Sequence, residues 1–528
     1  MSTEKTKGSA LTLHYSLFDL PSAQHKAGLA GLLVMIKSMQ KRGLEPLPEI
    51  RDLGPTGVTI SLTGESLQRL YDDFFASQRN KEGKIVPRAE FLESMKVPPL
   101  WSSLWRDIIT RVLRAGAPAQ MRAFRDRSTP EKPPSQWDWE KMWEHLTTHK
   151  RVEINGTDMI GIESVNAERV KYAASPKEAL LLTFWPVVSL PYVTQKMTTP
   201  KNRRVQDYLF SYYAYVMVIP EVSCLDDFVQ EIFELYPQSL NDAAPGKAPW
   251  PAQAVISTAK EAALLFASRQ YEGIDSFPIL DMVSSLHIIH LKYGKGSPDI
   301  INDSTVVPTR SLVNTYSKVV SGYFNPLFKK QLIENLFIRL AWYHGMYALF
   351  ATYPKEFFIQ CPESPKKIYG FFRDLKRKFF FIYQYIDADM EEGVKGEGNK
   401  EDLLALRIRS LVSQYIRRKA ERKSRMAFKG FQKDESGRIY YPTTYREAVK
   451  NVCMDIFLAM RGRQGQAFVE YFTGTLCSVP QCLSNDDFLL ISQALNNEWD
   501  KVKTLSMLAV SACSYLPGNK KDDKGKEV

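Results

Sequence analysis

The period of the hydrophobic pattern changes along this chain of 528 residues, and that change constrains the fold more than any single motif. From about residue 326, apolar residues recur at the spacing of amphipathic helices, without strand patterning in the C-terminal part. Before that point, a strand-like run at 11–18 precedes a helical run, and the Gly-Pro-Thr-Gly turn at 54–57 predicts two short strands around it. The pattern predicts an α+β fold, a mixed N-terminal α/β region followed by a C-terminal α-helical bundle.

The chain is long enough to form more than one domain. With 44% hydrophobic residues it can bury a substantial core. The segment 387–402 is acidic, contains glycines and lacks an apolar period, so it predicts a linker. The predicted parts are a mixed α+β body at 1–386, the linker at 387–402, a basic helical bundle at 403–516 and a disordered tail at 517–528. Within the bundle, helices are predicted at 403–427, 443–461, 464–474 and 485–515.

Positive charge is concentrated in one stretch of the sequence. Residues 366–463 contain 23 Lys and Arg residues against 13 Asp and Glu residues, whereas the whole chain has a formal charge of only +11. A field of one sign on helical segments attracts a polyanion, and nucleic acid is the polyanion that we favour. Charge alone leaves ribosomal surfaces, anionic membranes and a plain solvated helix surface open.

Cysteine usage and the N-terminal sequence indicate a compartment. The six cysteines are too few and too scattered for a disulfide scaffold, and no pair has C-x-x-C spacing. The N-terminus lacks the apolar core of a signal peptide, and the longest apolar runs are interrupted by polar residues. We therefore expect a soluble cytoplasmic protein without a membrane partner.

Motifs that carry catalysis are weak in this sequence. Asp387 and Asp389 invite comparison with a two-metal carboxylate site, but no histidine or further carboxylate motif supports one, so a linker is favoured. His287 and His290 lie in an apolar segment without further ligands and are interpreted as structural. The sequence has no phosphate-binding glycine loop and no serine or cysteine nucleophile motif. We expect a protein that is not an enzyme and uses no metal or cofactor.

Features that suit nucleic-acid binding are stronger. In the predicted helix at 403–427, one apolar face should bury, and basic residues project mainly from the remaining surface. Phosphate contacts explain such a cluster because they need charge density and little sequence readout, although for each single residue a solvated basic face is as good an account. The apolar face consists of Leu404, Ile408, Leu411, Val412 and Tyr415.

Two further segments are candidates for contact with nucleic acid. The loop at 201–204 lies between a proline and a strand, and its Arg and Asn side chains suit base edges in a duplex groove, with an ordinary polar turn as the alternative. The aromatic residues between Lys366 and Tyr385 suit base stacking, but at helical spacing they more often form a core. The candidate nucleic-acid-binding residues are Lys201, Asn202, Arg203, Arg204, Lys376, Arg377, Arg407, Arg417, Arg418, Arg422, Lys423, Arg425, Arg461 and Arg463, the last two in a flexible basic loop.

The segment Asp19-Leu20-Pro21-Ser22-Ala23-Gln24-His25-Lys26-Ala27-Gly28-Leu29 resembles the opening of a known family. That family comprises the large subunits of type I CRISPR surveillance complexes (Cascade), especially the myxan-type, type I-B-like branch. The rest of the chain is similar in length and in its mixed N-terminal and basic helical C-terminal parts. The resemblance implies a non-catalytic subunit that recognises a short PAM duplex, aids target unwinding, stabilises the R-loop and recruits an effector.

The resemblance also implies the partners. These are a CRISPR guide RNA, target double-stranded DNA, the backbone, guide-end-capping and small subunits, and an effector that is a helicase–nuclease or a transposition adaptor. In that case residues 1–386 would recognise the flanking motif and dock to the complex. Translation from an internal start at Met390 would give a separate small subunit. The alternative to the whole interpretation is a stand-alone basic RNA- or DNA-binding structural protein with a steep salt dependence.

Overall fold

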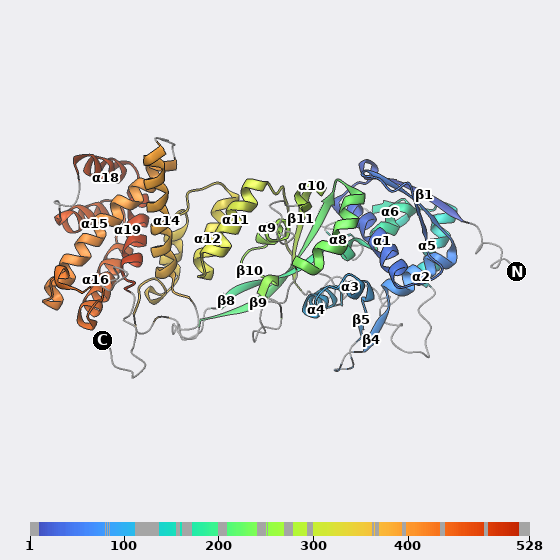
Figure 1. The fold of residues 1–528 in the computed structure, drawn as a ribbon, viewed down its shortest axis with the longest axis horizontal. Helices are drawn as coiled ribbons and strands as arrows, with labels where there is room; N and C mark the ends of the chain where they lie inside the picture. Colours follow the sequence, from blue (N-terminus) through green and yellow to red (C-terminus); the bar gives the residue numbers. More distant parts are fainter. Residues whose placement is uncertain are drawn as a thin grey trace. The chain divides into compact units, whose positions relative to one another are not determined.

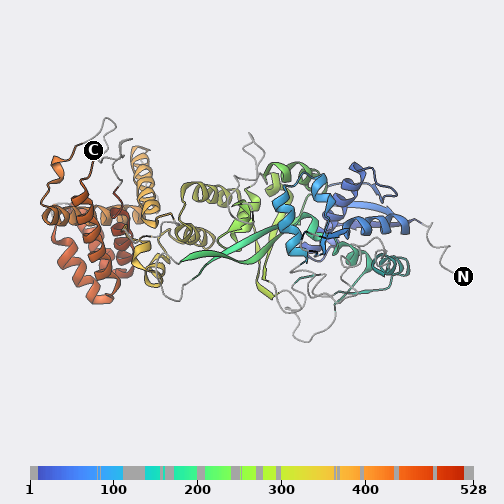
Figure 2. The ribbon, with the colours of Figure 1, turned by 90° about the horizontal axis from the view of Figure 1, so that it is seen from below.

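The computed structural model describes most of the chain, in two compact units. The first unit comprises residues 1–196 and 210–317, and the second comprises 197–209 and 318–528. Sheets lie in the N-terminal half and the C-terminal region is helical, so the predicted α+β class is confirmed (Figures 1 and 2). The described residues are 10–79, 81, 83, 85–110, 137–154, 159–160, 172–198, 208–239, 250, 252–268, 278–292, 299–361, 364, 369–392, 398–432, 439–479 and 484–516.

A small antiparallel sheet opens the first unit. Strand β3 (Gly57–Leu62) pairs with β1 (Leu11–Ser16) on one side and β2 (Glu49–Arg51) on the other. Burial alternates along β3 because successive side chains point to opposite faces, with every second residue in the core. The predicted N-terminal strand and the two strands around the Gly-Pro-Thr-Gly turn are confirmed.

Helix α1 (Ala23–Lys41) is the central helix of the first unit and is buried along most of its length. Ser22 caps its start, and the Ser22 Oγ accepts a hydrogen bond from the His25 amide at 3.4 Å. Gly43 follows its end with a φ of +68°, a left-handed conformation that glycine adopts without strain. The helix packs against α3, α6, α7 and α8 of the same unit.

Two glycines let α1 approach its neighbours closely. A Cβ on Gly28 would lie 2.3 Å from the Leu181 carbonyl oxygen, and a Cβ on Gly31 would lie 2.1 Å from that of Phe184. Both distances are far inside van der Waals contact, and the obstructing atoms belong to backbone that cannot rotate away. Gly28 and Gly31 are therefore positions of close packing between α1 and its neighbours.

Replacing Gly31 with alanine is expected to lower the free energy of unfolding by about 2 kcal/mol or more, because α1 must move away from the Phe184 backbone. Thermal unfolding of the purified chain measures the effect. Gly54→Ala is the matched control, since a Cβ there meets nothing within 4 Å. Equal melting temperatures for the two variants would show that α1 has room that the structure does not give it.

The larger sheet of the first unit has five strands in the order β10-β8-β9-β11-β12. β10 joins β8 in parallel, whereas β11 is antiparallel to both β9 and β12. The apolar run that contains His287 and His290 therefore forms a strand in the interior of the sheet. The strands are β8 (Leu190–Thr198), β9 (Leu209–Val222), β10 (Val255–Ile256), β11 (Val283–Lys292) and β12 (Asp299–Val306).

Short elements complete the first unit. Two two-stranded sheets pair β4 (Ser77–Arg79) with β5 (Ile85–Pro87) and β6 (Val152–Ile154) with β7 (Tyr172–Ala174). The helices are α2 (Gly64–Phe74), α3 (Glu90–Ser94), α4 (Pro99–Ile108), α5 (Trp137–Thr148), α6 (Pro176–Leu181), α7 (Trp185–Val188), α8 (Leu225–Ser239), α9 (Glu261–Ala267), α10 (Pro278–Met282) and α11 (Arg310–Gly322), which ends in the second unit. After residue 251 the chain forms a short turn and β10 before α9 begins at Glu261.

The second unit is built from helices. They are α12 (Pro326–Phe337), α13 (Met346–Thr352), α14 (Phe371–Glu392), α15 (Gly398–Ser424), α16 (Thr443–Arg461), α17 (Gly465–Thr475), α18 (Asn485–Asn497) and α19 (Trp499–Cys513). The single helix predicted at 485–515 is two helices, because Glu498 leaves the helical conformation with φ −142° and ψ 52°. α19 is buried along nearly its whole length between α14, α15, α16, α17 and α18.

The segment predicted as a linker, 387–402, lies inside the second unit. α14 continues to Glu392 and α15 begins at Gly398, so both helices extend into the segment where no helix was expected. Lys400 and the residues beside it are helical despite their weak apolar pattern, because the next turns of α15 anchor that helix in the core. A chain starting at Met390 would lack most of α14. The separate folding of the bundle at 403–516 stays a prediction.

Candidate nucleic-acid interface

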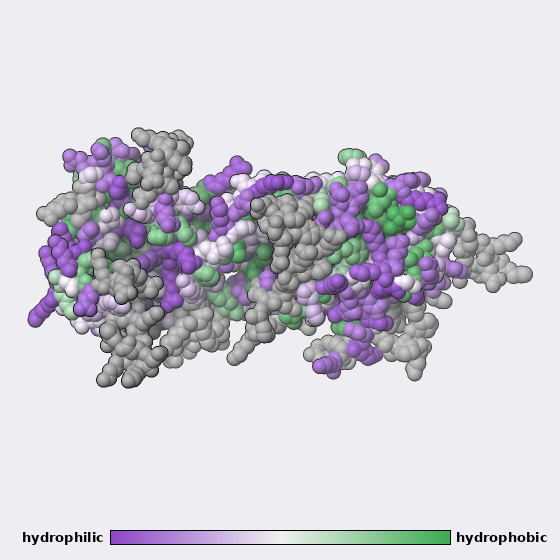
Figure 3. All heavy atoms as spheres, in the orientation of Figure 1, coloured by the Kyte–Doolittle hydropathy of each residue, from purple (hydrophilic) through white to green (hydrophobic). Residues whose placement is uncertain are grey.

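Helix α15 carries most of the predicted binding residues, and its apolar face fixes its position. The five residues predicted to bury are all at most 8% exposed, so this prediction is confirmed. They pack toward α16 and α19, and Arg409 lies over the ring of Phe379 on α14 at 5.2 Å. On the face drawn in Figure 3, the described surface of the second unit is mainly hydrophilic, with hydrophobic residues scattered in it.

The first turn of α15 is held by a partly buried polar network. Glu401 accepts hydrogen bonds from Lys501 at 2.8 Å and from the Tyr343 hydroxyl at 3.0 Å. Asp402 accepts one from Trp342 Nε1 at 3.1 Å, and the ammonium of Lys378 lies over the same indole ring at 5.4 Å. Burial raises the pKa of Asp402, and burial lowers that of Lys378. These contacts position the first turn of the helix.

The other end of α15 is where free positive charge gathers. Lys419, Arg422, Arg425 and Lys429 are exposed there, on the last turns of the helix and the short turn that follows. Among the described residues, no carboxylate forms an ion pair with any of the four. We call these four residues the basic end of α15. Cations near a helix C-terminus also interact favourably with the helix dipole.

Several predicted cations have partners inside the unit instead. Arg407 Nε lies 2.7 Å from Asp487, and Lys423 Nζ lies 3.0 Å from Asp455. Arg417 lies 3.5 Å from Glu421, and its guanidinium covers the ring of Phe428 at 4.0 Å. Arg418 is half-buried. Ion pairing reduces what the three paired cations offer to a phosphate, because their charge is already partly neutralised.

The other predicted binding residues of the second unit differ in burial, and each donates a hydrogen bond to a backbone carbonyl. Lys376 donates to the Tyr515 carbonyl at 3.3 Å, and burial lowers its pKa, whereas Arg377 is exposed and donates one bond to the Gly322 carbonyl at 2.8 Å. Arg461 donates to the Ala351 carbonyl and Arg463 to the Ala459 carbonyl.

The connection between α16 and α17, predicted as a flexible loop, is fixed by hydrogen bonds. Tyr347 donates to the Arg461 carbonyl at 3.3 Å, and buried Lys503 donates to the Arg463 carbonyl and, at 2.8 Å, to the Tyr347 hydroxyl. The two arginine side chains therefore start from an anchored backbone.

The predicted loop Lys201-Asn202-Arg203-Arg204 lies outside the described residues. Its place in the topology is nevertheless defined, because it connects β8 with β9, which are neighbours in the five-stranded sheet. The side chains of Asp387 and Asp389 also lie outside the described part of the structure.

The two histidines of β11 have partners within the sheet. His290 Nε2 lies 3.2 Å from the Thr194 hydroxyl, and His287 is paired with Asp303 on the neighbouring strand. These contacts fit the structural role that the sequence indicated.

One group of side chains in the described residues has the spacing of a metal site. The ligand atoms of Cys224, Asp226 and Asp227 lie within 4.8 Å of one another at the start of α8. However, the Cys224 thiol donates to both carboxylates, at 3.4 Å and 3.1 Å, and burial together with these bonds raises its pKa to about 12. The thiol and the two carboxylates are thus hydrogen-bond partners of one another, and nothing in their geometry calls for a metal ion.

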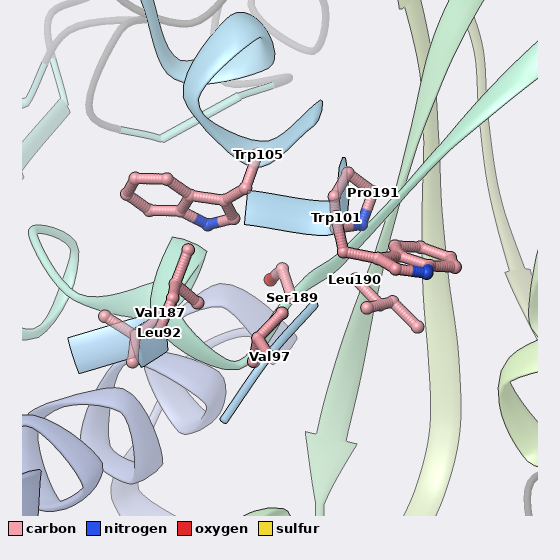
Figure 4. Close-up of a pocket in the computed structure, with 8 residues that line it drawn as sticks. All are labelled: Leu92, Val97, Trp101, Trp105, Val187, Ser189, Leu190 and Pro191. Carbon is pink, nitrogen blue, oxygen red and sulfur yellow. The ribbon is translucent and has the colours of Figure 1, made fainter. Parts of the chain in front are cut away.

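A small apolar hollow lies in the first unit beside α4 (Figure 4). The indole rings of Trp101 and Trp105 point to different sides of it, and Trp105 Nε1 donates to the Pro186 carbonyl at 2.8 Å. The lining residues are Leu92, Val97, Trp101, Trp105, Val187, Ser189, Leu190 and Pro191. No charged side chain lines the hollow, so it offers a ligand nothing beyond apolar contact and one hydroxyl.

The sequence interpretation missed some residues that the structure places on the surface. Lys419 and Lys429 stand beside the predicted arginines, and Arg373 is exposed on α14. The same charge count that singled out residues 366–463 includes all three. Within the described residues, none of the helices has the length and apolar character that crossing a membrane requires.

Comparison with known families identifies the chain. A family model described as the type I-B CRISPR Cas8b N-terminal domain matches residues 82–275. A second model, the type I-B CRISPR Cas8b C-terminal domain, matches residues 283–513, which include the basic end of α15. No curated protein matches the chain. Since the two models together match most of the sequence, the chain belongs to the Cas8b family, the large subunits of type I-B CRISPR complexes.

Proposed function

We propose that this large subunit engages target DNA for a guide-RNA complex, recognising a short PAM duplex, aiding unwinding, stabilising the R-loop and recruiting an effector. Family membership is the observation that carries the proposal. Guide RNA pairs with the target strand and reads its sequence, so the protein needs only a flanking-motif reader and backbone contacts. The subunit acts without catalysis and binds in the cell to backbone, guide-end-capping and small subunits, with a helicase–nuclease or transposition adaptor as effector.

The charge distribution of the second unit supports the part of the proposal that concerns DNA binding. The basic end of α15 offers four exposed cations that have no carboxylate partner among the described residues. Contacts of this kind bind phosphates irrespective of base sequence, as stabilising an opened duplex requires. The paired cations Arg407, Arg417 and Lys423, and the inward-turned Lys376, contribute less in this interpretation.

Reading of the flanking motif is assigned to the connection between β8 and β9. Replacing Asn202, Arg203 and Arg204 together with alanine is expected to change which flanking sequences are bound, because bidentate Arg and Asn contacts distinguish guanine and adenine edges. Each good contact of this kind contributes about 1–3 kcal/mol of discrimination, so the preferred flank should lose about tenfold or more against the others.

The measurement is selection of bound DNA from a library of flanking sequences, using the complex reconstituted with one guide. Wild-type enrichment of a short motif supports the proposed function, and bound DNA without a preferred flank contradicts it. Replacing the four residues of the basic end is the matched comparison, since phosphate contacts should lower binding to every flank equally. An equal loss across all flanks in the 202–204 variant would remove this loop as the reader.

A further inference from the structure

Helix α14 already has a complete buried face. Phe371, Leu375 and Phe379 are 0% exposed and Ile382 is 1% exposed, at the three- and four-residue spacing of one helical stripe. This stripe packs against α15 and α19 and accounts for the attachment of the helix to the unit. Aromatic residues on the opposite face are therefore not needed for the core.

The opposite face of α14 nevertheless carries large aromatic side chains. Phe380 is 53% exposed and Tyr383 is 54% exposed, and both follow Arg373 and Arg377 along the solvent side of the helix. Beside the two arginines, Phe324 is 50% exposed. Other rings of the chain are exposed as well, such as Phe488 at 57%, but these rings lie on one surface together with two arginines. Exposed apolar surface of this kind marks binding sites.

The two arginines are held flat against rings and keep their charge available. Arg377 lies 5.2 Å from the centre of the Phe324 ring, and Arg373 lies 5.2 Å from the Tyr369 ring. The Phe324 and Tyr369 rings are themselves 5.3 Å apart, which makes one continuous surface. In the described residues no carboxylate pairs with either arginine. One N–H of Arg377 donates to the Gly322 carbonyl at 2.8 Å, and stacking leaves the edge of each guanidinium open to an anion.

We propose that this surface, the α14 strip of Arg373, Arg377, Phe380 and Tyr383 with the Phe324 and Tyr369 rings, binds single-stranded nucleic acid. Bases stack on Phe380 and Tyr383, and phosphates lie at the two arginines. The inference rests on the proposed function and adds to it the binding mode and the residues. From Arg373 to Tyr383 the helix rises about 15 Å, which matches about four nucleotides at the spacing of a helical strand.

The chemistry of the strip favours a single strand over a duplex. In a duplex the faces of the bases are stacked on one another, whereas an unpaired base offers its face to an exposed ring. The strip offers both rings for bases and guanidinium groups for phosphates, the two parts of one unpaired strand. In a guide complex two strands offer this chemistry, the displaced DNA strand and unpaired guide RNA, and photocrosslinking distinguishes them.

The experiment uses the reconstituted complex with crosslinking nucleotides. One arm carries 5-iododeoxyuridine at successive positions of the displaced DNA strand, and the other carries 4-thiouridine in the guide. The crosslinked peptide is identified by mass spectrometry. A crosslink to residues 380–383 from the first arm assigns the strip to displaced DNA, and one from the second assigns it to guide RNA.

Affinity measurements with variants test stacking directly. Phe380→Ala with Tyr383→Ala is expected to weaken binding of a target with an intact displaced strand by about tenfold or more. Replacing both residues with tryptophan keeps a ring at each position and should restore binding. Phe488→Ala is the matched control, because Phe488 is 57% exposed on α18 in the same unit but lies outside the strip.

The outcomes separate this inference from the proposed function. If the strip binds displaced DNA, the alanine variant should match wild type on a target whose displaced strand is cut away beyond the flank. If the alanine variant binds the intact target with the affinity of wild type and neither arm gives a crosslink, the proposed role of the strip is wrong. Binding that depends on the flanking sequence would still support the proposed function in that case. Loss of other subunits from the purified alanine complex would make the strip a protein-docking face and would also overturn it. A wild-type complex that does not bind target DNA contradicts the proposed function itself.

Discussion

Replacing Arg422, Arg425 and Lys429 with glutamine is expected to lower the affinity of the assembled complex for target DNA by about a hundredfold at 0.15 M salt. Each phosphate contact releases condensed counterions, so the logarithm of the binding constant falls with the logarithm of salt by about 0.9 per contact. At 0.15 M salt one contact therefore contributes about fivefold. The three residues are exposed at the basic end of α15, and no described carboxylate neutralises them.

The salt dependence gives the sharper measurement. Binding is titrated from low to high salt with one guide and one target, and the slope of the triple variant should be smaller than that of wild type by about 2 to 3. Arg407, Arg417 and Lys423, replaced together with glutamine, form the control with the same change in charge. Their ion pairs with Asp487, Glu421 and Asp455 predict a smaller change in slope. The same slope change in both variants would show that free and paired cations contribute equally.

Local and periodic features of the structure were predictable from the sequence. The buried face of α15 and the strands around the Gly-Pro-Thr-Gly turn each depend on residues a few positions apart. The N-terminal segment that carries the family resemblance also has a structural explanation. Its Gln24 side chain donates to the Ile160 carbonyl at 2.8 Å and accepts from the Ile160 amide at 3.1 Å in the core.

The pairing of surface cations was not predictable in the same way. Arg407 and Lys423 look equivalent to Arg422 in the sequence, yet their partners Asp487 and Asp455 come from later helices. Such pairs depend on how α15, α16 and α18 pack, and one sequence without homologues contains no signal for them. The candidate site could therefore be predicted as a charged helix, but the free and neutralised charges on it could not be distinguished.

The roles of the aromatic residues between Lys366 and Tyr385 were predictable from the sequence only in part. Phe379 is fully buried and Phe380 is half exposed although they are adjacent, because a helix turns about 100° per residue. Counting three- and four-residue steps from the buried Phe371 and Leu375 reaches Phe379 but not Phe380, so the sequence already distinguishes these two rings. Both interpretations of the stretch, core and stacking surface, thus apply to different residues of one helix, with stacking still to be tested.

Asp374→Ala is expected to lower the free energy of unfolding of the second unit by about 3 kcal/mol. Asp374 is 0% exposed, and its Oδ2 accepts hydrogen bonds from the backbone amides of Phe324 at 2.7 Å and Asn325 at 2.6 Å. Asn325 in turn caps α12 and donates to the Tyr369 carbonyl. Alanine leaves both amides without their acceptor. The backbone at Asn325 is buried, so bringing a water molecule there to accept the hydrogen bond costs free energy.

Asparagine at the same position separates the hydrogen bonds from the charge. Its side-chain oxygen still accepts from the two amides, so Asp374→Asn should cost less than Asp374→Ala. Hydrogen exchange measured by mass spectrometry gives the local readout, since the amides at 324 and 325 should lose protection in the alanine variant only. A loss of protection in both variants would show that the carboxylate charge, rather than an acceptor oxygen, holds this connection.

The pH dependence of stability is a second consequence of burying this carboxylate. Burial raises the pKa of Asp374 above its ordinary value, although the two amides oppose the shift. Between the ordinary and the raised pKa the folded chain holds a proton that the unfolded chain has released, so stability falls as pH rises through that window. Asp374→Asn removes this contribution.

Because Asp374 and Asn325 also position Phe324 and Tyr369 beside the arginines of the α14 strip, the alanine variant should weaken single-strand binding as well, whereas the asparagine variant should preserve it.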